Sequence, residues 1–131
     1  QHVCKNRSWF TKYVPEESGR IIHMGNESTA PVLGNDEVEL LFSSGKSVYL
    51  KNVLHVPSLR KNLVSSGQLS RCGYKQVIES DRYVLSKCGV FVGFGYLCND
   101  MFMLNLSTKY IHNVMLCYVM MLIYLRYDML V

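Results

Sequence analysis

The sequence lacks the marks of several common protein classes. It has no Cys-x-x-Cys pair, three prolines in 131 residues, and no apolar core of a signal peptide in residues 1–19. Zinc ribbons, thioredoxin-type redox sites, and Pro-rich disordered or secreted chains are therefore not expected. The longest continuous apolar run, residues 114–125, has twelve residues. A membrane-spanning helix needs about twenty, so a membrane partner is not expected either.

Charge and cysteine content point the same way. The net charge is +4, from 14 basic and 10 acidic residues, and no basic cluster accompanies it. A nucleic-acid partner is therefore not expected. The five cysteines are odd in number and widely spaced, and the lone pair His2 and Cys4 has no second pair at zinc-finger spacing. We expect free thiols in an intracellular, cytoplasmic protein, with no metal and no cofactor.

Turn residues recur about every ten positions up to residue 106, which is the rhythm of an all-β barrel or sandwich. One domain is expected at 1–106, mainly β, with a short helix at residues 62–72. The strands are expected at residues 20–25, 29–33, 37–42, 46–56, 74–79, 82–86, 90–96 and 101–106.

Alternation of apolar and polar residues along these strands predicts which side chains are inside. Glu37, Glu39, Lys51 and Asp81 are expected to be exposed. The expected core consists of Val38, Leu40, Phe42, Val48, Leu50, Leu54, Leu63, Leu69, Val77, Ile78, Val84 and Val92.

Residues 107–131 have a different character, with four of the seven methionines and four of the nine tyrosines. We expect an apolar tail, helical and packed on the domain, or a translated extension. A membrane anchor is the less favoured alternative because the apolar run is short.

No local pattern identifies a catalytic, cofactor or metal site. Each candidate lacks a partner that its chemistry requires: a second carboxylate, a base, a third glycine or a basic neighbourhood. The candidates considered were Glu17-Ser18-Gly19, Asp36, His23 and His55, Ser65 and Ser66, Gly93-Phe94-Gly95, and Lys51 with Arg60 and Lys61.

Residues 51–69, K-N-V-L-H-V-P-S-L-R-K-N-L-V-S-S-G-Q-L, closely resemble a stretch of Pol polyproteins from copia-type LTR retrotransposons, especially the TNT type. The resemblance continues through residues 71–75, 79–86 and 92–98, begins at Gln1, and fades after Leu106. It covers about four fifths of the chain. The resemblance implies a small, partly open, retropepsin-like β-barrel.

In that family the residues just before the equivalent of Gln1 resemble Asp-Ser-Gly-Ala-Thr, the aspartic-protease signature. The resemblance implies a homodimer in which one Asp from each subunit shares a proton, and a polypeptide substrate if the enzyme is intact. The four Asp here precede neither Ser-Gly nor Thr-Gly. Asp36 also stands where the family favours Gly in a turn after Gly34-Asn35. We therefore expect the first strand and its catalytic loop to be cut off.

The favoured hypothesis is a non-catalytic remnant of a retrotransposon Pol polyprotein β-barrel domain, truncated before the integrase. One alternative is a fragment of an aspartic endopeptidase that processes the element's polyprotein, with the Asp-Ser-Gly loop upstream. Another is a membrane-tethered or oligomeric interaction module that uses residues 107–131. Loss of a first strand leaves an open edge, so the chain is expected to be marginally stable or prone to aggregation.

Overall fold

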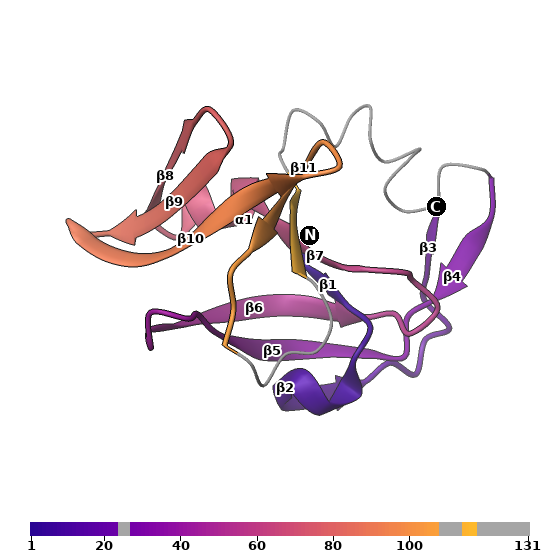
Figure 1. The fold of residues 1–131 in the computed structure, drawn as a ribbon. Coiled ribbons are helices and arrows are strands. Elements are labelled where there is room, and N and C mark those ends of the chain that lie inside the picture. Colours follow the sequence, from indigo (N-terminus) through magenta and orange to yellow (C-terminus); the bar gives the residue numbers. More distant parts are fainter. Residues whose placement is uncertain (24–26, 108–113, 118–131) are drawn as a thin grey trace.

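The computed structural model describes residues 1–23, 27–107 and, for the backbone alone, 114–117. These residues are mainly β, with one α-helix and one short 3-10 turn (Figure 1). The elements in chain order are β1 (Val3–Cys4), η1 (Arg7–Trp9), β2 (Phe10–Pro15), β3 (Ile21–His23), β4 (Thr29–Pro31), β5 (Gly34–Leu41), β6 (Ser47–His55), β7 (Asn62–Ser65), α1 (Ser66–Arg71), β8 (Tyr74–Glu79), β9 (Arg82–Lys87), β10 (Val90–Cys98), β11 (Met101–Leu104) and β12 (Val114–Cys117).

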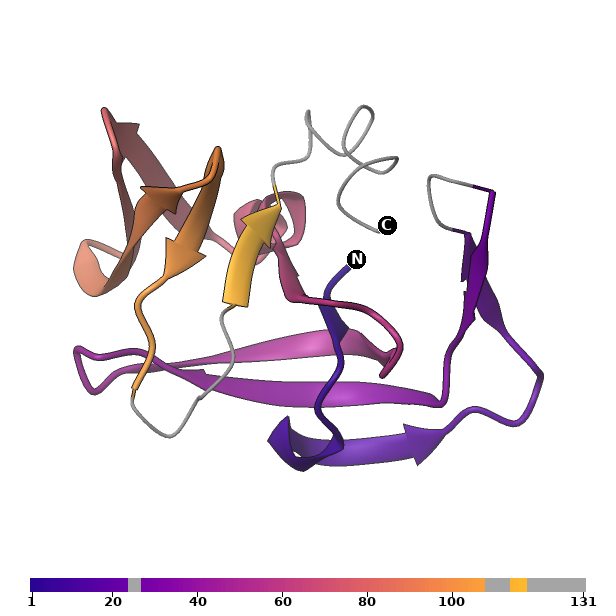
Figure 2. The same ribbon diagram turned by 45° about the vertical axis from the view of Figure 1, so that its right-hand side comes forward.

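Ten of the strands form one sheet in the order β2-β5-β6-β1-β7-β12-β11-β10-β9-β8. The order starts at β2 and ends at β8, so the barrel does not close through these strands. The mainly β, partly open architecture expected from the sequence is confirmed. Strands β3 and β4 form a separate hairpin, which stands to one side of the main sheet (Figure 2).

Long antiparallel pairs build both ends of the sheet. β5 and β6 pair from Gly34↔His55 to Leu41↔Ser47, across the turn at residues 43–46. At the other end, β8, β9 and β10 form successive hairpins. β1 joins the two ends, because it is parallel to β6 and antiparallel to β7.

The main apolar core lies between these two ends of the sheet. Phe42 and Tyr83 are among its largest buried side chains, with 1% and 0% of their surfaces exposed. The core predictions confirmed by burial are Val38, Leu40, Phe42, Val48, Leu50, Leu54, Leu63, Leu69 and Val92.

Three predicted core residues near β8 are placed differently. Val77 and Ile78 are 39% and 47% exposed, and Val84 is half-buried. Their neighbours Tyr83 and Leu85 point into the core instead. The prediction was wrong for Val77 and Ile78 because β8 is the end strand of the sheet, and such a strand is packed from fewer sides than a central one.

Glu37 was expected outside but is buried, whereas Glu39 is half-buried and Lys51 and Asp81 are exposed. Lys51 forms an ion pair with Glu37, and the hydroxyl of Thr11 donates a hydrogen bond to it at 2.8 Å. The pKa of Glu37 is below its ordinary value mainly because of the hydrogen bond from Lys51, and then because of the one from Thr11. The carboxylate is thus covered by side chains of strands β2 and β6 that neighbour β5. The sequence did not show β2, so it did not show this cover.

The helix is shorter than expected. Residues 62–72 were predicted as one helix, but Asn62–Ser65 form β7 and the helix begins at Ser66. A short apolar run is ambiguous between helix and buried strand, and β7 lies between β1 and β12. Ser65 ends the strand and caps the helix, since its hydroxyl accepts a hydrogen bond from the backbone N–H of Gln68.

The turn expected after Gly34-Asn35 is also absent. Gly34–Leu41 is one strand with a bulge between Asp36 and Val38, and Asp36 has φ of 157°, close to extended backbone. Gly34 has a packing reason instead. A Cβ there would lie 2.2 Å from Cζ of Tyr13, whose ring rests on this glycine.

One strand of the main sheet comes from the segment expected to be a helical tail. Val114–Cys117 form β12, parallel to β7 and antiparallel to β11 (Figure 2). The helix expected in the segment is therefore wrong for these four residues. The other tail positions, 108–113 and 118–131, lie outside the described residues. The division of the chain at residue 106 stays a prediction.

Candidate functional site

A polar cavity of about 500 Å³ is the candidate site. It is walled by residues from both halves of the sequence. They are Gln1, Arg20, Asn35, Asn52, Leu54, Gln68, Arg71 and Cys72.

Several separate elements bring these residues together. Arg20 directly precedes β3, Asn35 lies on β5, and Asn52 lies on β6. Asn52 has a left-handed φ of 54°, and its carbonyl oxygen accepts a 2.6 Å hydrogen bond from Nε2 of Gln1. Arg71, the last residue of α1, also lines the wall, although it is far from Arg20 in the sequence. Long-range packing therefore assembles the cavity.

The guanidinium and amide groups of this wall can donate hydrogen bonds, and the amide oxygens can also accept them. Arg20 and Arg71 carry guanidinium groups, and four further residues carry side-chain amides. Such groups bind carbonyl, carboxylate or other oxygen-rich groups. The described residues of the wall include no carboxylate and no imidazole, so the wall offers no pair of groups for general acid–base catalysis.

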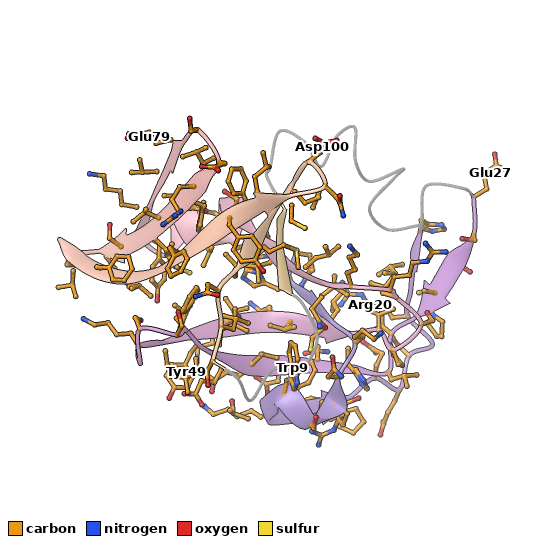
Figure 3. The ribbon with its side chains drawn as sticks, viewed as in Figure 1. Trp9, Arg20, Glu27, Tyr49, Glu79 and Asp100 are labelled. Carbon is orange, nitrogen blue, oxygen red and sulfur yellow. The ribbon has the colours of Figure 1, made fainter. Side chains whose placement is uncertain are left out.

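The carboxylates considered from the sequence are dispersed. Glu17 is exposed in the segment between β2 and β3, and the hydroxyl of Ser18 donates to Glu16 rather than to Glu17. Asp36 lies within β5, opposite Tyr13 and Val53. Figure 3 shows acidic residues at the ends of three different hairpins, namely Glu27, Glu79 and Asp100. No two of these form a dyad of the kind an aspartic protease requires.

His2 and Cys4, the pair noted for its spacing, are both buried next to backbone partners. Nδ1 of His2 accepts a 2.9 Å hydrogen bond from the backbone N–H of Ser65, and the thiol of Cys4 donates to the carbonyl of Asn6. Burial raises the pKa of Cys4 to about 12. Across the described residues, no group of three or more His, Cys, Asp or Glu could hold a metal ion. The contacts of this pair are those of structural residues.

A pH dependence follows from His2. Burial, then the charges of the α-amino group and Arg71, lower its pKa from 6.5 to about 4. The folded state therefore binds its proton more weakly than the unfolded state. Stability from this group is complete above pH 6.5 and is lost as the pH falls toward 4.

We expect the free energy of unfolding to fall by about 3 kcal/mol across this window. His2→Asn removes the imidazole and should flatten the loss in urea melts at successive pH values. His23→Gln, at an exposed position, is the control and should keep it. An unchanged slope in His2→Asn contradicts the assignment.

The other candidates have structural roles. The rings of His55 and Tyr13 lie beside each other, with 2.8 Å between Nδ1 and the phenol oxygen. The pKa of His55 is lowered mainly by desolvation on burial. Ser65 caps α1, and Ser66 donates to the side chain of Gln76. None of these is placed in the cavity wall.

The remaining patterns do not form binding sites either. Gly93 follows a bulge in β10, and residues 93–95 lie within this strand. Lys51 is paired with Glu37, on a different element from Arg60 and Lys61. Arg60 and Lys61 are exposed in the loop between β6 and β7. These basic residues therefore do not form a joint site.

Sequence reasoning missed the cavity residues. Arg20 and Arg71 are 51 positions apart, and no local motif links them. Arg71 begins the stretch at residues 71–75 that carries the family resemblance, but that resemblance assigns it no role. Arg20, labelled in Figure 3, lies next to the end of β4, because its carbonyl oxygen accepts a hydrogen bond from the backbone N–H of Val32. The sequence pattern did not connect this region to α1. The wall could have been predicted only from the way β5, β6 and α1 pack against one another, which the sequence pattern does not show.

Comparisons with known proteins agree on one family. Residues 1–74 match the family model described as the Pol polyprotein, beta-barrel domain. The chain is also similar to the retrovirus-related Pol polyprotein from transposon TNT 1-94 of Nicotiana tabacum, with 30% identity over 104 residues. That alignment covers 79% of this chain, which spans about 8% of the length of the relative. No solved structure matches the chain.

Proposed function

Since this chain belongs to the family of Pol polyprotein β-barrel domains, we propose that it is a retrotransposon Pol domain without peptidase activity of its own. The observation that supports this is the composition of the cavity wall. Arginines and amides line it, and the carboxylates of the described residues lie elsewhere. A wall of this kind is suited to binding oxygen-rich groups rather than to activating a water molecule.

Hydrolysis by an aspartic protease needs two carboxylates that share one proton around a water molecule. Asp36 and Glu17 are the residues nearest in sequence pattern to that requirement. The first lies between neighbouring strands and the second is exposed in a loop. Neither lines the cavity.

We expect no cleavage of a peptide library between pH 4 and 7, with or without pepstatin, the range in which carboxylate dyads work. Asp36→Asn and Glu17→Gln should behave like the unchanged chain. Pepstatin-sensitive cleavage that either substitution abolishes contradicts the proposal.

The alternative, a fragment of an aspartic endopeptidase, is favoured by one observation. Gln1 lines the cavity, so any residues preceding it in a longer chain would start at this wall. An Asp-Ser-Gly-Ala-Thr segment placed there would bring a carboxylate to the cavity, and a second copy would supply the partner Asp for a polypeptide substrate. The same peptide assay on an extended chain tests this alternative. Cleavage by the extended chain, lost on Asp→Asn in the added segment, would establish it.

The interaction-module hypothesis depends on residues 107–131. Of these, Val114–Cys117 hydrogen-bond within the main sheet and so are not a separate tether. No helix in the described part of the chain has the length and apolarity for crossing a bilayer. Detergent partitioning of the chain with and without residues 118–131 tests what remains of the hypothesis.

A further inference from the structure

Strand β8 is the end strand of the ten-stranded order and pairs with β9. An end strand presents backbone N–H and C=O groups along its free side, and these can pair with another strand. Among the described strands, none pairs with β8 on that side. This edge of β8 can therefore form backbone hydrogen bonds with an additional strand.

The two faces of β8 differ in what covers them. Gln76 faces α1, where its amide donates to the carbonyl of Ser66 at 3.0 Å and to the hydroxyl of Ser70 at 2.8 Å. Lys75, Val77 and Glu79 alternate with it on the opposite face. All three are exposed, with 39% of the Val77 surface accessible.

Val77 is one end of an apolar row that crosses three strands. It stands opposite Val84 of β9, which stands opposite Phe94 of β10. Both neighbours are half-buried. The row stops at Val77 because the described sheet stops at β8. A further strand beside β8 could continue it.

The charges on this face are self-complementary. Lys75 and Glu79 are equally spaced on either side of Val77, and no ion pair among the described residues involves either of them. Arg82 of β9 stands opposite Glu79, but its guanidinium lies over the ring of Phe94. If two copies of β8 run antiparallel with Val77 opposite Val77, Lys75 of each copy stands opposite Glu79 of the other. A slip of two residues in either direction places one of these charges opposite Val77 instead. The pattern therefore selects one register.

We propose that the occupant of this edge is a second copy of the chain, paired antiparallel through β8 about a two-fold axis at Val77. The pairing joins the two sheets into one and extends the apolar row as Phe94, Val84 and Val77 followed by the same residues of the second copy. The interface is isologous, as a closed dimer requires. It does not depend on whether the domain has peptidase activity.

The test is a charge exchange measured in the full chain by analytical ultracentrifugation over a range of concentrations. Lys75→Glu and Glu79→Lys each place two like-charge pairs across the axis. Each should raise the dimer dissociation constant about tenfold or more. The double variant, Lys75→Glu with Glu79→Lys, restores opposite charges and should restore dimerisation.

Lys12→Glu is the matched control for Lys75→Glu, because Lys12 is exposed on β2 at the opposite end of the sheet and the two substitutions change the net charge equally. It should leave the dissociation constant unchanged. Thermal melts by circular dichroism confirm that each variant is folded.

Several results overturn the proposal. A chain that is monomeric at every concentration leaves the β8 edge to a different partner or to none. A dimer that tolerates both single exchanges, or one that the double exchange does not restore, does not use this register. A dimer weakened by Lys12→Glu instead uses the β2 edge.

Discussion

A chain that ends at residue 113 is expected to melt at a markedly lower temperature than one that ends at Cys117. The difference between them is β12, which sits inside the sheet between β7 and β11. It pairs with β7 from Val114↔Asn62 to Cys117↔Ser65, and with β11 at two positions. Its loss turns two interior strands into edges.

The loss of folding stability on removing β12 comes from unpaired backbone groups and from lost side-chain packing. Buried N–H and C=O groups left without partners cost about 1–3 kcal/mol each, unless the strands rearrange to admit water. Leu63 of β7 and Met103 of β11 are buried together beside this seam. We expect a loss of about 3–5 kcal/mol, a large part of the total for a small domain. That loss corresponds to a melting temperature lower by roughly 10 °C or more.

The measurement is a thermal melt of three chains ending at residues 113, 117 and 131. The chain ending at 117 is the matched control, because it lacks residues 118–131 and keeps β12. If the two shorter chains melt together, β12 does not contribute to the stability of the sheet.

The second large effect is expected at Gly93, which lies against the buried ring of Phe42. A Cβ at this position would lie 2.2 Å from Cδ1 of Phe42. Phe42 is 1% exposed, so its ring has little room to move. Gly93→Ala should destabilise the domain by about 1–3 kcal/mol through overpacking, and Gly93→Val by more.

Urea unfolding of a double-mutant cycle tests the cause. Phe42→Leu reduces the ring that the new Cβ meets, so Gly93→Ala should cost less in that background than alone. Equal costs in both backgrounds would place the strain elsewhere, for example in the backbone of β10.

Strands β3 to β6 and β8 to β11 could be predicted largely from alternation and turn residues, whereas β7 and β12 were expected to be helical. Val38, Leu40 and Phe42 alternate with polar neighbours, and their inward face follows from that period alone. The family could also be inferred from the sequence, because the run at residues 51–69 is long and specific. Strands β1 and β2 were missed because β1 has two residues and β2 places only Phe10 in the core.

The sequence by itself determined the mainly β class, most of the core and the family, because these depend on period-two patterns and on contiguous residues. Tertiary structure alone decided the cavity, the place of β12 and the burial of Glu37. Gln1 reaches the wall that Arg20 and Arg71 share because β1 holds the N-terminal segment between β6 and β7. Val114–Cys117 became a strand rather than part of a helix because β7 and β11 offer them backbone partners on both sides. These three features could not be predicted from the sequence because interaction partners at distant positions leave no local pattern of residues.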